Sequence, residues 1–315
     1  MQNTMPSKKD SRHYFLGIDG GGTKTVFRLT DENGTIVKEL YKGSTNPNDI
    51  GMGNTLNLLR EGISEICASL PYEKITLFAG ISGGGLTGEN ASVLKRFFGE
   101  FGFYAFDNGS DLENLIALAD RNSCILVIMG TGFIVYALNG EKRRRIAGWG
   151  QFFDEGGSGY TIGKDVITAV LDEMDGSGEK TLLSSLLEKR VGESAEAHLA
   201  EFYRGGKRYI AEFASLAFEA ADMGDAVALG ILEKNMAFAA QKIRTAMREF
   251  SETDQPKIPI FFSGGITKRC GLIFPMIEKH LSDSRSFLTV IEGEPIEGAV
   301  KRALAIFEEK QKGKR

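Results

Sequence analysis

A glycine-rich stretch near the N-terminus constrains the fold of this chain more than any other feature. Gly17–Thr25 reads Gly-Ile-Asp-Gly-Gly-Gly-Thr-Lys-Thr and lies between the apolar run 14–16 and the strand-like segment 26–30. A turn signal at 31–34 and another strand-like segment at 35–37 follow it. The glycines therefore connect two strands of a hairpin, and they do not open a helix.

The position of this loop decides between phosphate-binding schemes. A Walker loop needs Gly-Lys-Ser/Thr running into a helix, whereas Gly22 is followed by Thr23. A dinucleotide fingerprint also places a helix after its glycine turn. The bare backbone of a hairpin instead lets amides approach phosphate oxygens, with the Thr23 and Thr25 hydroxyls as further donors. Asp19 lies where a carboxylate can hold Mg²⁺ through water, although a hairpin turn without a ligand is the simpler alternative.

Length and composition bound the class of protein. A chain of 315 residues is long enough for two domains. The net charge of −4 argues against nucleic acid or a membrane surface as the main partner, and the basic run 143–145 predicts a solvated turn beside a hairpin. Three widely spaced cysteines indicate neither a disulfide framework nor a metal site. Because no run resembles a signal peptide or a membrane span, we expect a cytoplasmic protein with a disordered polar segment at 1–12.

The predicted elements follow an α/β order. After the opening strands, helices and strands alternate, which is typical of a mixed sheet covered by helices. Apolar spacing and turn residues predict the helix 55–70, the strand 75–79, the helix 90–101, the strand 103–106 and the helix 111–119.

The second half of the chain repeats the opening arrangement. The strand 124–129, the turn Gly130-Thr131-Gly132 and the strand 133–138 match the strand–glycine–strand order of the N-terminus. This repeat places a domain boundary near Asp120. The remaining predictions are helices from about 162 and through most of 181–250, a strand at 258–262, a helix at 272–281, a strand at 287–291 and a helix at 297–308.

These motifs resemble those of a known superfamily. Asp19–Thr25 is similar to the first phosphate loop of actin, hexokinase and the heat-shock chaperone ATPases. Within it, the chain resembles the BadF/BadG/BcrA/BcrD ATPase family, particularly its N-acetylglucosamine kinase branch, from about 15 to about 307. The resemblance implies a two-domain ribonuclease H-like (actin-like ATPase) fold, in which mixed five-stranded sheets flanked by helices border a cleft. It also implies domains at 13–120 and 121–315, with the last helix able to pack back onto the first domain, and a homodimer.

The resemblance assigns ATP and Mg²⁺ to the glycine loops. A second phosphate loop at Gly130–Gly132 would face the first, and the two loops would hold the phosphates. Ser263-Gly264-Gly265-Ile266 resembles the adenosine motif, in which bare backbone packs against the nucleoside. The family usually has serine after the second loop, where this chain has Phe133. The implied cofactor-binding residues are Asp19, which also binds the metal, Gly20, Gly21, Gly22, Thr23, Lys24, Thr25, Gly130, Thr131, Gly132, Gly264 and Gly265.

Asp111 is the candidate catalytic base. Phosphorylation of a hydroxyl needs a carboxylate that accepts its proton and holds the oxygen in line with the γ-phosphorus. In the kinases that it resembles, this carboxylate follows a strand and opens a helix shortly before the second phosphate loop, as Asp111 does. Two alternatives stay open: Asp111 caps the helix and nothing more, or Asp107 is the base.

The resemblance also implies contacts to a sugar. Amide and hydroxyl groups suit a polyol, and an aromatic ring suits a sugar face, although a turn residue or a core residue would look the same. The family commonly reads Gly-Asp-Glu-Gly-Ser after the Gly-Trp-Gly motif, whereas this chain reads Asp154-Glu155-Gly156-Gly157-Ser158, so one carboxylate is lengthened and the other is missing or moved to Asp154. The implied sugar-binding residues are Asn46, Ser82, Gly83, Thr131, Gly148, Trp149 and Glu155.

The sequence therefore predicts an ATP-dependent sugar kinase. The expected substrate is a hydroxyl, at carbon six, of an amino sugar such as N-acetylglucosamine or glucosamine. One alternative is an ATPase activator of an acyl-CoA dehydratase or reductase, but its shared iron–sulfur cluster needs paired cysteines that this sequence lacks. The other alternative is a non-catalytic sugar- or nucleotide-sensing protein on the same fold.

Overall fold

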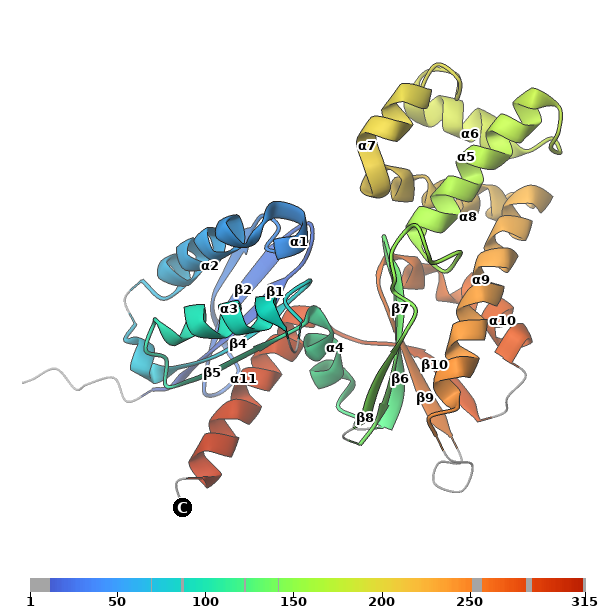
Figure 1. The fold of residues 1–315 in the computed structure, drawn as a ribbon. Coiled ribbons are helices and arrows are strands. Elements are labelled where there is room, and N and C mark those ends of the chain that lie inside the picture. Colours follow the sequence, from blue (N-terminus) through green and yellow to red (C-terminus); the bar gives the residue numbers. More distant parts are fainter. Residues whose placement is uncertain are drawn as a thin grey trace, which may run out of the picture. The chain divides into compact units, whose positions relative to one another are not determined.

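The computed structural model describes residues 12–68, 70–85, 88–121, 123–140, 142–250, 257–281 and 285–313. The chain forms two compact units (Figure 1). Unit 1 consists of Met1–Arg121 together with Glu292–Arg315, and unit 2 consists of Asn122–Ile291. The segment 1–12, which the sequence predicts to be disordered, lies outside the described residues except for Arg12.

Unit 1 is built on a mixed sheet with the strand order β3-β2-β1-β4-β5. The first three strands are antiparallel neighbours, and β4 and β5 add to β1 in parallel. The bounds of the strands are β1 (Tyr14–Gly20), β2 (Thr25–Asp31), β3 (Ile36–Lys42), β4 (Ile75–Ile81) and β5 (Ala105–Gly109). Because β1 and β4 are covered on both faces, they are apolar along nearly their whole length.

Helices cover both faces of this sheet (Figure 1). Leu16 points to the core formed with α2 and α3, and its neighbour Phe15 points to the opposite face, where it packs against α11. This alternation explains why two separate clusters of apolar residues flank one sheet. The helices of unit 1 are α1 (Pro47–Ile50), α2 (Met52–Ile66), the 3-10 helix η1 (Tyr72–Lys74), α3 (Glu89–Gly99), α4 (Asp111–Ala119) and α11 (Pro295–Lys312).

Unit 2 repeats the topology of unit 1. Its sheet has the order β10-β9-β6-β7-β8, with β6, β7 and β8 antiparallel and β9 and β10 parallel to β6. Its strands are β6 (Ser123–Met129), β7 (Phe133–Asn139), β8 (Lys142–Ile146), β9 (Ile258–Ser263) and β10 (Ser286–Val290). The predicted fold of two mixed five-stranded sheets flanked by helices is confirmed.

Most helices of the chain belong to unit 2 and share one apolar core with its sheet. They are α5 (Gly159–Asp175), α6 (Leu182–Val191), α7 (Leu199–Glu212), α8 (Ala214–Asp222), α9 (Ala226–Met247), the 3-10 helix η2 (Gly265–Arg269) and α10 (Cys270–Leu281). Among the described residues of both units, no helix is long and apolar enough to cross a membrane.

The structure corrects several local predictions. The basic run 143–145 lies in β8 and not in a solvated turn, because it pairs with β7. The helix predicted at 272–281 begins two residues earlier, at Cys270, because α10 continues directly from η2. The predicted boundary near Asp120 leaves Glu292–Arg315 in the second half, but α11 buries its apolar face against β1 and β2 of unit 1, as the prediction allowed for the last helix.

The packing of α11 against α4 leaves no space for a side chain. A Cβ atom on Gly298 would lie 1.8 Å from the carbonyl oxygen of Asn114 in α4. A Cβ atom on Gly17 in β1 would likewise lie 2.8 Å from the backbone nitrogen of Val300. The two glycines therefore allow α11 to lie directly on the backbone of the first strand and of α4.

We expect Gly298→Ala to lower the free energy of unfolding by about 2–3 kcal/mol, because the added methyl group must push α11 away from α4. The matched control is Gly53→Ala in α2, where a Cβ atom would meet no atom within 4 Å. That change should be neutral, or stabilising by up to about 1 kcal/mol. Urea unfolding of both variants measures the difference, and equal stabilities would contradict the described packing.

Candidate functional site

The first glycine loop is a tight turn between β1 and β2. The Gly21 N–H donates to the carbonyl of Lys24 over 2.9 Å, and Gly20 pairs with Thr25 at the base of the hairpin. A Cβ atom on Gly20 would lie 2.5 Å from the Thr45 hydroxyl oxygen, so only glycine fits here. Thr23 and Lys24, at the tip of the turn, are exposed residues. This arrangement fits the predicted hairpin.

Thr25 does not have the predicted orientation. Its side chain is fully buried, and its hydroxyl donates to the carbonyl of Gly43 over 2.8 Å. The hydroxyl oxygen also lies 2.8 Å from that of Thr45. The prediction that this hydroxyl donates to phosphate is therefore wrong, because Thr25 uses it to hold the loop against the segment that follows β3.

Asp19, at the end of β1, is held by a residue from α4. The Asn114 Nδ2 donates to the Asp19 Oδ1 over 2.6 Å, and the amide passes Gly80 in β4 so closely that a Cβ there would lie 2.3 Å from its oxygen. Burial raises the pKa of the Asp19 carboxyl to about 6; the Asn114 hydrogen bond opposes this rise, and the charge of Asp111 adds to it. Asp19 is thus poised to bind a proton or a cation.

Asp111 is the first residue of α4, and Ser110 occupies the N-cap position. The Ser110 side chain makes no capping hydrogen bond, so the alternative that Asp111 only stabilises the start of this helix stays open. Burial raises the pKa of Asp111, while hydrogen bonds from Ser82 and from the backbone N–H groups at the start of α4 oppose that rise. The Ser82 N–H also donates to the carbonyl of Gly20 over 2.7 Å, which ties the ends of β1 and β4 together.

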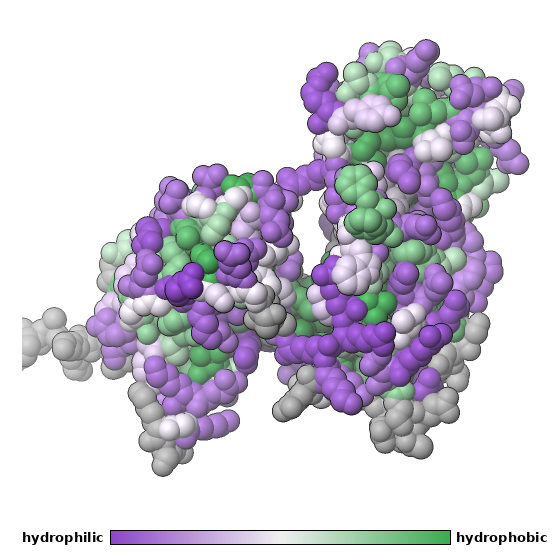
Figure 2. Space-filling model, in the orientation of Figure 1, coloured by the Kyte–Doolittle hydropathy of each residue, from purple (hydrophilic) through white to green (hydrophobic). Residues whose placement is uncertain are grey.

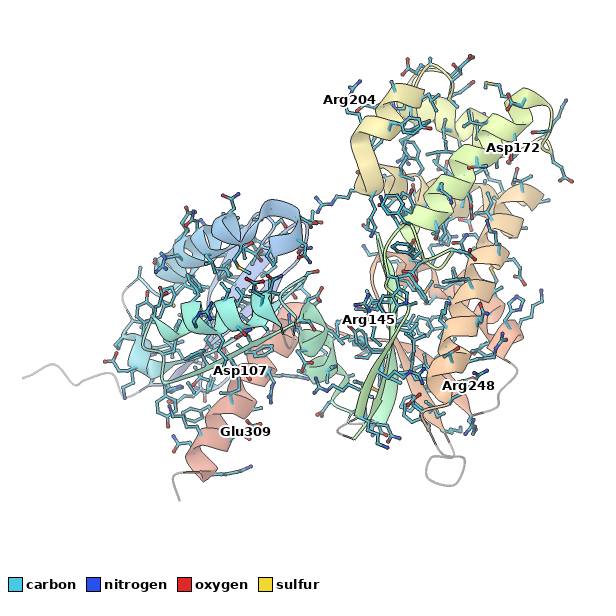
Figure 3. The ribbon with its side chains drawn as sticks, in the orientation of Figure 1. Asp107, Arg145, Asp172, Arg204, Arg248 and Glu309 are labelled. Atoms are coloured by element: carbon cyan, nitrogen blue, oxygen red, sulfur yellow. The ribbon has the colours of Figure 1, made fainter. Side chains whose placement is uncertain are left out.

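The rival carboxylate, Asp107, has a different environment (Figure 3). It lies within β5, its side chain is 38% exposed, and its Oδ1 is 3.4 Å from the Lys95 ammonium of α3. An exposed ion pair of this kind is a common surface contact. The structure therefore favours Asp111 over Asp107 as the base.

The predicted sugar contacts of unit 1 lie near each other. A Cβ atom on Gly83 would lie 2.2 Å from the Asn46 Oδ1, so Gly83 allows the segment after β4 to approach Asn46. Asn46 caps α1 by accepting from the Asn48 N–H over 3.0 Å, and its Nδ2 donates to Asp49. The structure thus brings Asn46 and Gly83 together, while Ser82 contacts the carboxylate of Asp111.

The second glycine turn, Gly130–Gly132 between β6 and β7, is held by the start of α5. The Gly130 N–H donates to the carbonyl of Gly132 over 2.9 Å, and the Gly159 N–H donates to that of Gly130 over 2.7 Å. Tyr160 donates to Thr131 in the same way. These bonds leave the Thr131 side chain exposed beside a pocket.

This pocket has a volume of about 640 Å³ and lies entirely within unit 2. Gly265 lines it, whereas Gly264 supports it from behind: with φ of +105°, a Cβ on Gly264 would lie 2.4 Å from the carbonyl oxygen of Met129. The second predicted phosphate loop, Gly130–Gly132, and the predicted adenosine motif, 263–266, thus meet at one cavity. The lining residues are Gly130, Thr131, Gly159, Arg208, Ala211, Glu212, Ala214, Ser215, Phe218, Gly265, Ile266, Lys268 and Arg269.

The Gly148-Trp149 segment forms a left-handed loop after β8. Ala147 has φ of +63°, an uncommon value for a residue with a side chain, and Gly148 has φ of +76°. Arg145 holds this loop, because its guanidinium lies 4.5 Å from the Trp149 ring centroid and donates to the carbonyls of Ala147 and Gly148. The indole stays 63% exposed. Figure 2 shows hydrophobic residues interspersed with hydrophilic ones on the visible face, and Phe152 and Phe153 after this loop are exposed as well.

The two carboxylates that follow differ in their environment. The Asp154 carboxylate is buried and accepts from the Gly150 N–H over 3.0 Å, whereas Glu155 is exposed. Asp154 therefore closes its own loop. Among the described residues, the Glu155 carboxylate has no hydrogen bond or ion pair, which leaves it available to a ligand.

Phe133 and the glycines of this loop pack together. The Phe133 ring is buried, and a Cβ on Gly157 would lie 2.8 Å from it. A Cβ on Gly156 would lie 2.7 Å from Phe238 of α9, whose ring centroid is 5.9 Å from that of Phe133. Phe133, one departure from the family pattern, thus packs on Gly157, which matches that pattern, and its neighbour Phe238 packs on Gly156, the other departure.

Sequence reasoning missed three residues that support these sites. Asn114 lies one helical turn after Asp111, and this spacing was the available signal. Asn235 in α9 is fully buried, accepts from the Gly157 N–H over 3.1 Å and from the Thr161 hydroxyl over 2.8 Å, and so fixes the start of α5. No local pattern marks it. Arg145 belongs to a basic run whose individual roles the sequence does not distinguish.

Comparison with known proteins agrees with these motifs. The model of the BadF/BadG/BcrA/BcrD ATPase family matches residues 16–300. An N-acetylmuramic acid/N-acetylglucosamine kinase from Clostridium acetobutylicum is 30% identical over 85% of this chain and 90% of its own. An N-acetyl-D-glucosamine kinase from Dictyostelium discoideum is 26% identical over 87% and 92%.

A solved structure shows the same fold. It belongs to a protein from Chromobacterium violaceum proposed to be an N-acetylglucosamine kinase, and it aligns with a TM-score of 0.69 and 23% identity. The alignment covers 92% of this chain and 99% of that one. Because the family model spans nearly the whole chain and both glycine turns, the protein belongs to the BadF/BadG/BcrA/BcrD ATPase family.

Proposed function

We propose that the protein transfers the γ-phosphate of ATP to the carbon-six hydroxyl of an amino sugar. The observation that carries this proposal is the pair of half-buried carboxylates at the ends of β1 and β5, Asp19 and Asp111, both with raised pKa values. The curated relatives support the substrate class, since both are named as kinases of N-acetylglucosamine. A homodimer and a cytoplasmic location stay predictions from the sequence.

Asp111 has the features that a general base needs. The pKa of Asp111 is raised toward neutral pH. A carboxylate with such a pKa accepts a proton more readily than an ordinary one. In the proposed step, the sugar oxygen forms a bond to the γ-phosphorus, its proton passes to Asp111, and the bond from this phosphorus to ADP breaks. Ser82 orients the carboxylate by donating a hydrogen bond to it.

Asp19 is the residue that would hold Mg²⁺. The described residues contain no cluster of three acidic, histidine or cysteine side chains fit for a metal. This agrees with Mg²⁺, which binds through one or two carboxylates, several waters and the phosphates of its substrate. The Asn114 Oδ1 beside it is buried without a partner among the described residues, so it can accept from a bound water. The ion would neutralise charge on the phosphates.

The pocket of unit 2 is the proposed nucleoside site. Its volume suits a nucleoside, and its wall combines the apolar Phe218 and Ile266 with the bare backbone of Gly265. The Gly130–Gly132 turn begins at this wall, which suits phosphates that extend from the nucleoside. ATP as the nucleotide agrees with membership of an ATPase family.

We assign candidate sugar contacts in each unit by itself. In unit 1 we assign Asn46, Ser82 and Gly83 to the sugar hydroxyls. In unit 2 the Trp149 indole offers a flat apolar face, and Glu155 offers a carboxylate without a partner among the described residues. We also assign Gly148, which precedes Trp149, and Thr131 of the second glycine turn to the sugar. Because Asp154 is used within its loop, Glu155 is the acid that we assign to substrate.

We expect Asp111→Asn to lower sugar-dependent ADP release about 10³-fold, because an amide cannot accept the proton. The measurement is coupled ADP release with Mg-ATP and a panel of N-acetylglucosamine, N-acetylmuramic acid, glucosamine, N-acetylmannosamine and glucose. Asp107→Asn is the matched control and should keep the wild-type rate, since that carboxylate is an exposed partner of Lys95.

Three outcomes would change this assignment. Turnover that survives in Asp111→Asn and falls in Asp107→Asn would move the base to Asp107. Sugar-independent ADP release would indicate an ATPase without a sugar substrate. Binding of ATP and of a sugar without any turnover would contradict the kinase and support a sensor.

We also expect Asp19→Asn to abolish turnover and yet raise stability above pH 6. The pKa of Asp19 is about 6 in the folded protein, whereas its ordinary value is 3.8. Ionisation of Asp19 therefore opposes folding, and the stability of the wild type rises as the pH falls from above 6 toward 4. Asparagine removes this penalty and still accepts from Asn114. The gain should be about 1–3 kcal/mol at pH 8 and should vanish near pH 4.

Urea unfolding in EDTA across this pH range measures the effect without a bound metal. Glu61→Gln, at an exposed position of α2, is the control for removal of one negative charge and should show no such pH-dependent gain. A constant difference between Asp19→Asn and wild type at all pH values would contradict the raised pKa.

A further inference from the structure

Helix α7 is broken close to the nucleotide pocket. Gly206 has φ of +64° and ψ of −163° inside the helix, a conformation that favours glycine. The segment after this break contributes Arg208, Ala211 and Glu212 to the wall of the pocket. The break therefore determines how the chain enters the wall, and Lys207 is the first residue after it.

The ammonium group of Lys207 lies over the second glycine turn. Its Nζ is 3.5 Å from the position that a Cβ atom on Gly132 would occupy. Gly130 and Thr131 line the pocket, whereas Gly132 and Lys207 do not. The positive charge of Lys207 thus lies beyond the wall of the pocket, beside Gly132 at the C-terminal end of the turn.

Lys207 has no counter-ion in the described part of the chain. The side chain is half-buried, and no carboxylate lies within ion-pair distance of it among those residues. Glu201 on the same helix pairs with Arg204 instead. A partly buried cation without a partner is unfavourable, and an anion placed in the neighbouring turn would satisfy it.

We propose that Lys207 binds the phosphates of the nucleotide beyond the α-phosphate. This inference rests on the proposed nucleotide site of unit 2 and adds a residue that no glycine motif indicates. A lysine suits the task because it is a compact charge with three donors on a flexible stem. The Gly130–Gly132 turn supplies backbone to the phosphates, and Lys207 supplies the positive charge that this turn lacks.

The test compares the affinities of ATP, ADP and AMP by calorimetry in magnesium buffer. Lys207→Gln should weaken ATP and ADP binding at least about tenfold and leave AMP binding unchanged, because AMP does not reach the ammonium group. Lys207→Arg should keep most of the affinity for ATP. The control is Arg204→Gln on the same helix, where the side chain is exposed and paired with Glu201 (Figure 3), and it should not alter binding of any nucleotide.

The outcomes separate this inference from the proposed function. An equal loss for ATP, ADP and AMP would show that Lys207 only maintains the pocket, and an unchanged ATP affinity would show that it does not contact phosphate. Either result overturns the inference while nucleotide binding stands. A wild-type protein that bound none of the three nucleotides would overturn the nucleotide site itself.

Discussion

The hydrogen bond between Asn114 and Asp19 is the interaction on which the candidate chemistry of unit 1 depends. It connects the end of β1 to α4, and α4 also positions Asp111 at its first turn. The bond requires Gly80, because any side chain there would occupy the space of the Asn114 amide. It also requires Gly298, because this glycine lets α11 pack directly against α4. Two glycines far apart in the sequence thus set the position of one carboxylate.

The two units share a topology but use it differently. In each, a glycine turn joins the first two antiparallel strands, and the parallel strands follow in the same order. In unit 1 the strand ends carry acidic side chains with raised pKa values. In unit 2 they carry bare backbone beside a cavity. One repeated frame therefore carries acidic side chains in the first copy and a cavity in the second, and we propose these as the proton acceptor and the nucleotide pocket.

The sequence was sufficient for the family, the fold class and the kinase class, because these depend on the order of glycine loops and on apolar spacing within single elements. It also placed Asp111 at the start of a helix. It could not distinguish Asp154 from Glu155, since their difference is a hydrogen bond to Gly150. Asn114 contacts Asp19, 95 positions away, and Asn235 contacts Gly157, 78 positions away. The spacing of Asn114 from Asp111 marks a shared helix face, but no local pattern names either distant partner.

The packing of Phe133 against Gly157 constrains how relatives of this chain can diverge. A serine at 133 would leave a ring-sized hole beside Phe238, and a side chain at 157 would collide with the present ring. Gly157 also has φ of +79°, so its backbone favours glycine whatever residue stands at 133. Divergence at this contact is therefore confined to position 133, and a change there reaches the loop that carries Glu155.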